Sequence, residues 1–207
     1  MNSRIKVLQE QKRHAQEKEI KTLELSSDSA ICREDVEFLS AIGKEIYELL
    51  ENIYITQAPI LKNREELISY SSSLYADSPE LQEHLYKILK DRDNLADTYI
   101  KPFQALLLHG RSPKLTRSCF GYARLEPPIY EKGRIIRGAI VSLIPSGPAS
   151  EVAAPVTSEV IGTLLEEPAL LKALQSLNKE SFTKQLEEIL LRFYKSTVQT
   201  RLHLKTS

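Results

Sequence analysis

The sequence has 207 residues, of which 42% are hydrophobic and 27% are charged, a composition typical of a globular chain with an apolar core. Its 28 Lys and Arg residues balance its 28 Asp and Glu residues, so no overall positive field favours nucleic acid or an anionic membrane. No apolar run approaches the roughly 20 residues that a membrane span needs. Cys32 and Cys119 lie far apart without a pairing pattern, which favours a reducing, cytoplasmic setting.

Two segments are predicted before the main domain. Residues 1–30 are dense in Lys, Glu, Gln and Arg and end in serines, so we expect a charged helical or linker segment there. Apolar residues then recur every three or four positions from Val36 to Ile53, which predicts a helix with one buried stripe. We therefore assign 31–57 to a connector helix, which could cap the following domain or pack against a neighbouring one.

Helical and strand patterns alternate in the main domain, assigned to 58–195, with 196–207 as a tail. Asn63 with Glu66 predicts a helix start, and Ser78-Pro79 predicts the next. Three strands follow, at 103–109, 119–125 and 135–144. Three apolar-periodic helical segments, 151–165, 168–177 and 182–194, close the domain. The expected fold is α/β, a mixed sheet sandwiched by helices, with an N-terminal helical extension.

A histidine at the end of a predicted strand is the main candidate for chemistry. Neutral imidazole is nucleophilic near pH 7, so His109 could accept a phosphoryl group. The product would need a cation or backbone donors nearby. Arg92 lies seventeen positions upstream, and Arg111 and Ser112 follow the histidine directly. The alternative is that His109 only ends a strand and donates to a backbone carbonyl.

The order of residues around His109 resembles the phosphorylated-histidine segment of the mannitol/fructose-type IIA proteins of the bacterial sugar phosphotransferase system. The matching residues, with one extra position before the histidine, are Arg92, Leu95, Thr98, Ile100, Ala105, His109 and Gly110. Segments 120–129, 140–145 and 161–167 resemble further family segments, so the resemblance spans about 35–194. It implies an IIA-like fold, phosphorylation of His109 assisted by Arg92, and Thr98 and Glu151 near the phosphoryl group or partner.

Two departures from transport-type members favour a regulatory relative. Leu108 replaces the proline that those members place before the histidine, and Ser150-Glu151 resembles the C-terminal IIA-like domain of mannitol-operon transcription activators. Transport-type members also carry a second histidine near the start of the helix after the central strand, where this chain has Glu151 and Ala154. The leading hypothesis is a regulatory phosphohistidine domain of a sugar-operon transcription regulator.

Two other functions stay open at this point. One is a transport IIA component that relays phosphate from HPr to a IIB cysteine, and the other is a non-catalytic interaction module, since anion transporters share the fold. The resemblance implies HPr, a IIB-type domain and other domains of a regulator as partners, and leaves a homo-oligomer open. The histidines and cysteines are dispersed without metal-ligand spacing, so we expect no metal site. The sequence also lacks a glycine-rich phosphate-binding loop, so we expect no cofactor. We expect no direct contact with nucleic acid or membrane.

Overall fold

The computed structural model describes residues 33–203, so the charged segment expected at 1–30 lies outside the described residues. The helices are α2 (Arg33–Glu51), α3 (Arg64–Ser73), α4 (Pro79–Leu95), α5 (Ser150–Glu166), α6 (Pro168–Gln175) and α7 (Lys179–His203). The strands are β1 (Ile53–Gln57), β2 (Tyr99–Ile100), β3 (Ala105–Ser112), β4 (Cys119–Glu131) and β5 (Arg134–Pro145). Short 3-10 turns lie at Lys101–Phe103 and Gly147–Ala149.

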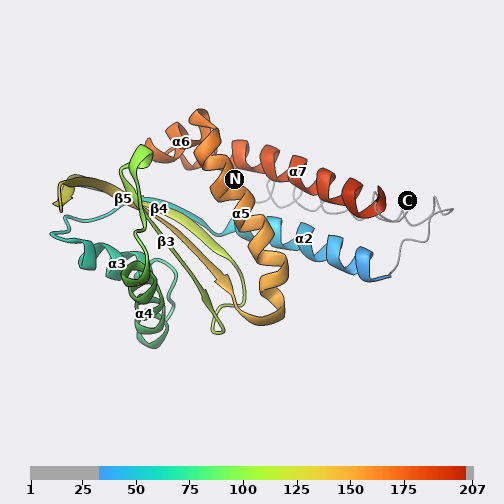
Figure 1. Ribbon diagram of the computed structural model, residues 1–207, viewed down its shortest axis with the longest axis horizontal. Coiled ribbons are helices and arrows are strands. Elements are labelled where there is room, and N and C mark those ends of the chain that lie inside the picture. The colour runs from blue at the N-terminus through green and yellow to red at the C-terminus, as the bar shows by residue number, and fades with distance from the viewer. Residues whose placement is uncertain (1–32, 204–207) are drawn as a thin grey trace, which may run out of the picture.

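The strands form one mixed sheet in the order β1-β4-β5-β3-β2 (Figure 1). β1 runs parallel to β4 and β3 runs parallel to β5, whereas β4 with β5 and β2 with β3 are antiparallel. β2 pairs only with Ala105 and Leu106. The remainder of β3 therefore forms the edge of the described sheet. The expected mixed α/β fold class is confirmed.

Helices cover both faces of this sheet (Figure 1). On one face, α3 and α4 bury Leu67, Ile68, Leu85 and Leu89 against the strands. On the other face, α2, α5, α6 and α7 form a second core, with members such as Ile42, Val160, Leu174 and Phe182. Both predicted helix starts are confirmed, because Asn63 Oδ1 accepts from the Glu66 amide at 2.9 Å and Ser78 Oγ accepts from the Leu81 amide at 3.2 Å.

The periodic N-terminal helix packs within the domain rather than presenting a free stripe. Ile42, Ile46 and Leu49 of α2 belong to the core, and α2 lies beside α7 (Figure 1). Arg201 of α7 pairs with the buried Asp35 at 3.2 Å. Of the two packing modes left open for this helix, the structure shows the first, a cap on its own domain.

Several element boundaries differ from expectation. β3 runs to Ser112, so His109 does not end the strand as expected, and β4 runs to Glu131 rather than to residue 125. α2 ends at Glu51, and Ile53–Gln57, expected within the connector helix, forms β1 in the sheet. The break follows from Asn52, whose side-chain amide donates to the Glu48 carbonyl at 2.6 Å and closes the helix. At the other end, residues 196–203 of the expected tail continue α7. β2 was not expected, because two residues are too few to produce a strand pattern.

Gly121 of β4 occupies a position that a side chain cannot share. A Cβ there would lie 2.4 Å from the Tyr54 carbonyl oxygen and 2.1 Å from the Tyr75 hydroxyl. We expect Gly121→Ala to lower the free energy of unfolding by about 1–3 kcal/mol, because β1 must move away from β4. Gly162→Ala is the matched control, since its Cβ meets nothing within 4 Å, and it should stabilise α5 by about 0.5–1 kcal/mol. Urea unfolding of both variants measures the difference, and equal stabilities would contradict the steric argument.

Glu45 of α2 is a buried carboxyl whose Oε1 has no hydrogen-bond partner among the described residues. Burial raises its pKa from 4.5, and the nearby Ser118 hydroxyl only partly opposes this. A raised pKa in the folded state adds stability below about pH 4.5 and loses it as pH rises through the raised value. We therefore expect Glu45→Gln to gain stability relative to the wild type as pH increases towards 8. Glu34→Gln, at an exposed position of the same helix, is the control, and an identical pH dependence of wild type and Glu45→Gln would refute the prediction.

Candidate functional site

His109 lies on the edge strand β3, with its side chain on the face opposite α4. The next residue, Gly110, faces α4, where its Cβ would meet Ile88 at 2.3 Å. Side chains alternate along a strand, so His109 shares the other face with Leu107, which packs against the second core. The imidazole is half-buried. It is therefore fixed by a rigid strand and remains open at the sheet edge.

Arg92 contacts His109 directly. Arg92 Nε, from the last turn of α4, donates to His109 Nε2 at 3.1 Å. The two residues come from opposite sides of the sheet, and the exposed arginine reaches around the open edge of β3. His109 Nδ1 lies 3.4 Å from the Leu107 carbonyl oxygen. A ring that accepts at Nε2 and is neutral carries its hydrogen on Nδ1, so the Nε2 lone pair is the one that faces the guanidinium.

Ser112 is placed away from this histidine, contrary to expectation. Its fully buried hydroxyl contacts His84 Nε2 at 3.0 Å and accepts from the Lys114 amide at 3.1 Å. By strand alternation it points to the α4 face, three positions beyond His109. Arg111 is exposed and shares the face of His109. Arg111 therefore remains a candidate for binding the phosphoryl group or the partner, and Ser112 does not.

The remaining two predicted site residues lie in different settings. Thr98 is buried, and its hydroxyl hydrogen-bonds with Arg64 and Asp93 rather than with His109. Glu151 is exposed in the first turn of α5. No histidine occurs anywhere in α5 (Ser150–Glu166).

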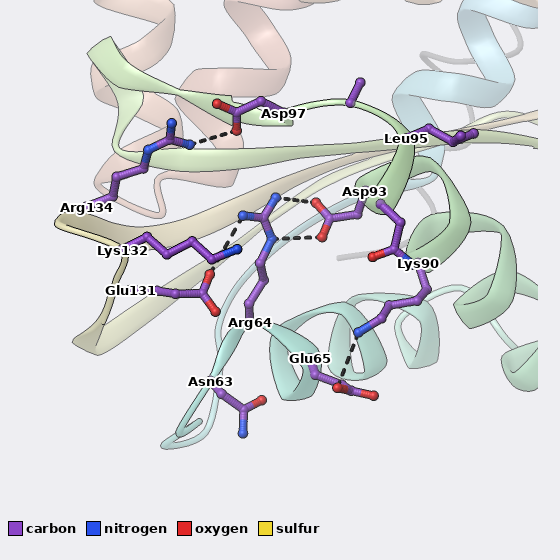
Figure 2. A pocket seen from close by; sticks show the side chains of 12 residues that line it. Asn63, Arg64, Glu65, Lys90, Asp93, Leu95, Asp97, Glu131, Lys132 and Arg134 are labelled. Carbon is purple, nitrogen blue, oxygen red and sulfur yellow. Dashed lines mark hydrogen bonds and ion pairs between the residues drawn. The ribbon is translucent and has the colours of Figure 1, made fainter.

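A partly buried ion-pair network, which no sequence pattern indicates, surrounds Arg64 (Figure 2). It includes Asp93, the residue after Arg92. Arg64 binds Asp93 through two nitrogens, with Nε to Oδ2 at 2.8 Å and Nη2 to Oδ1. Arg64 Nη1 also lies 3.7 Å from Glu131 Oε2. Burial by itself lowers the pKa of Arg64, but hydrogen bonding to Asp93 and the charges of Asp93 and Glu131 offset this and leave the pKa raised. The network forms the floor of an open, polar pocket of about 640 Å³.

Residues 33–203 contain neither a metal-ligand cluster nor a helix that could cross a membrane. No group of three or more His, Cys, Asp or Glu side chains is arranged to hold a metal ion. None of the helices in this range is long and apolar enough to cross a membrane.

The fold and the Arg92–His109 contact define a class of protein, an α/β domain that holds a histidine imidazole beside an arginine guanidinium. A sequence profile described as "Phosphoenolpyruvate-dependent sugar phosphotransferase system, EIIA 2" matches residues 48–189. The chain belongs to this family of histidine phosphocarriers. Domains of the family exchange phosphate with HPr and IIB proteins.

Solved structures similar to this chain include two with IIA names. The nitrogen regulatory protein IIA-Ntr from Neisseria meningitidis is 17% identical, with a TM-score of 0.49, and the match covers 68% of this chain and 94% of that one. IIA mannitol from Escherichia coli is 16% identical, with a TM-score of 0.44, covering 64% and 96% respectively. A comparison with curated protein sequences gives no significant match.

Proposed function

We propose that this domain is a regulatory EIIA domain that accepts a phosphoryl group from HPr on Nε2 of His109. The observation that carries the proposal is the 3.1 Å contact between Arg92 Nε and His109 Nε2. It supports a chemical role over a non-catalytic interaction module, because it places a guanidinium donor on the ring nitrogen that would carry the phosphoryl group. The proposed setting is cytoplasmic, within or beside a sugar-operon transcription regulator, with a IIB-type domain as a second exchange partner.

The proposed reaction is an in-line transfer. The lone pair on His109 Nε2 attacks the phosphorus of the phosphohistidine of HPr, a new P–N bond forms, and the donor P–N bond breaks to release the imidazole of HPr. His109 Nδ1 keeps its hydrogen, with the Leu107 carbonyl oxygen 3.4 Å away. As the donor approaches and before attack, Arg92 exchanges its contact with Nε2 for contacts with the phosphoryl oxygens, where a charge-assisted pair is strongest. This exchange frees the Nε2 lone pair. Arg111, on the same face, supplies a second cation to the incoming group or to HPr.

A regulatory role is supported by the composition of α5. A second histidine at its start would donate to the phosphoryl oxygens during onward transfer, and α5 has none. The exposed Glu151 in its first turn is a carboxylate, which cannot donate to a phosphoryl oxygen as an imidazole can. A slowly exchanging phosphohistidine suits a switch, where the added charge near His109 changes a contact with a neighbouring domain. The alternative is a transport EIIA component.

The test of the proposed function is incubation of the chain with radiolabelled phosphoenolpyruvate, enzyme I and HPr. We expect one acid-labile, base-stable phosphoryl group per chain, dependent on HPr. Omission of HPr is the control. Failure of the chain to incorporate radiolabel, under conditions in which a known EIIA protein is labelled, would refute the proposal.

Arg92→Lys is expected to slow phosphorylation about tenfold to a hundredfold without unfolding the domain. An ammonium cannot reproduce the planar guanidinium donor at Nε2, and a charge-assisted hydrogen bond contributes about 1.5–3 kcal/mol. Arg124→Lys is the matched control, because Arg124 lies on β4, two strands from β3. Rapid-quench measurements with phosphorylated HPr give the rates. Equal rates for Arg92→Lys and Arg124→Lys would mean that Arg92 has no part in transfer.

A further inference from the structure

We propose that Arg64 is a positioning residue, which holds Arg92 against His109 by clamping the end of α4. This inference rests on the proposed function and goes beyond it by assigning a role to a side chain that does not touch His109. The clamp consists of Arg64 and Asp93, which line the pocket in Figure 2, and of the buried Thr98, whose hydroxyl contacts both of them. The contacts of Asp93 lead to Arg92 and those of Thr98 lead to β3, while Arg64 also lies 3.7 Å from Glu131 of β4.

The first part of the clamp holds Arg92's own turn of helix. Asp93 directly follows Arg92, and both of its carboxylate oxygens bind the Arg64 guanidinium. The pair is well shielded, since the side chains of Arg64 and Asp93 are 18% and 7% exposed. A bidentate arginine–carboxylate pair fixes orientation as well as distance. The backbone at Arg92 is therefore set by a contact made one residue away.

The second part of the clamp links that turn to the histidine's strand. The Thr98 hydroxyl donates to Asp93 Oδ1 at 2.6 Å and accepts from Arg64 Nη2 at 2.9 Å. The Thr98 carbonyl accepts from the Leu107 amide at 2.7 Å, two residues before His109. Asp93 and Thr98 thus connect the helix that carries Arg92 to the strand that carries His109. The clamp sets the separation of the two elements.

The position of Arg92 explains why such a clamp matters. Arg92 lies in the last turn of α4, which ends at Leu95, and terminal helical turns fray because their last carbonyls lack helical partners. Leu95 is 79% exposed and cannot anchor that end. Arg64 comes from a different helix. It is the first residue of α3, whose N-terminus is capped by Asn63. The clamp is therefore the buried anchor for the turn that carries Arg92.

Other ion pairs around the pocket lack this geometry. Lys90 pairs with Glu65 at 3.2 Å and Arg134 pairs with Asp97 at 2.7 Å. Glu65, Arg134 and Asp97 are 63%, 42% and 55% exposed, so these pairs are solvated and weak. Lys90→Met therefore removes a charge from the same pocket without loosening the clamp. It is the matched control.

The test is a double-mutant cycle on single-turnover phosphorylation by phosphorylated HPr. We expect Arg64→Met to lower the maximal rate about tenfold, with the half-saturating HPr concentration unchanged, and Arg64→Lys to lower it less. In the Arg92→Met background, Arg64→Met should have no further effect, because Arg64 acts only through Arg92. Lys90→Met should match the wild type. A tenfold further loss in the Arg92→Met background would overturn the proposal, since it would show a role independent of Arg92.

A second variant distinguishes loss of the clamp from misfolding. A second measurement distinguishes failure of the clamp from failure of the proposed function. If Arg64→Met does not fold, Thr98→Val, which removes only the hydroxyl link, must show the same non-additivity with Arg92→Met. Nitrogen-15 NMR of the unphosphorylated protein is independent of HPr. We expect a protected Arg92 Nε–H and the Nδ1–H tautomer of His109 in wild type and Lys90→Met, and loss of both in the clamp variant. Unchanged signals would overturn the clamp even if no phosphorylation occurs, whereas lost signals without phosphorylation would refute only the proposed function.

Discussion

His109→Ala is expected to abolish acid-labile phosphorylation of the chain. In the proposed reaction Nε2 of His109 is the nucleophile, and Arg92 Nε donates to that atom. Alanine offers no atom that can form a P–N bond. The fold should survive, because His109 is only half-buried and lies at the sheet edge. Phosphorylation by enzyme I and HPr, followed by an acid-lability assay, measures the loss.

His84→Ala is the control for this experiment. His84 is also half-buried, but its ring contacts Ser112 on the opposite face of β3. The His84→Ala variant should therefore be phosphorylated as the wild type is, despite the loss of the contact with Ser112. Phosphorylation that persists in His109→Ala and is lost in His84→Ala would identify His84, on the other face of the sheet, as the acceptor. That result would contradict the proposed site.

Transfer from phosphorylated His109 to a IIB cysteine is expected to be about a hundredfold slower than in a transport EIIA component. Loss of one donor to the developing charge typically costs that much in rate, and α5 supplies no histidine for this role. Sugar uptake in a transport system lacking its EIIA component gives the measurement. This chain should restore little uptake.

A gain-of-function variant sharpens the transport prediction. Glu151→His replaces the carboxylate in the first turn of α5 with an imidazole donor, so under the proposed function it should raise the rate of transfer to IIB. Glu166→His, at the far end of the same helix, is the control. Uptake at the normal rate by the unmodified chain would show that it is a transport component.

The helical parts of the fold could be predicted because their signals are local. Cap residues such as Asn63 and Ser78 act within three positions, and the apolar periodicity of α2 directly gives the face that enters the core. β1 was missed because its apolar residues continue the helical pattern that precedes it. Its strand character comes from pairing with β4, more than sixty residues away in sequence, and such pairing leaves no local pattern.

The residues of the candidate site also fall into those that the sequence predicts and those that it does not. Arg92 and His109 were predicted from a sequence resemblance, and the structure brings their side chains together. Ser112 was expected beside His109 because it is close in sequence, but strand alternation turns its hydroxyl to the other face. Arg64 was not predicted, because its partner Asp93 is 29 residues away and no sequence spacing indicates the pairing. Side chains that act across elements become visible only in the folded chain.

Phosphorus-31 and nitrogen-15 NMR of the chain phosphorylated by HPr tests the central claim most directly, because it identifies the residue and the ring nitrogen together. We predict a single phosphohistidine, with phosphorus bonded to Nε2 of His109, and displacement of the Arg92 Nε–H signal from its position in the unphosphorylated protein. A phosphoryl group on any other residue, or on Nδ1 of His109, would contradict the proposed site.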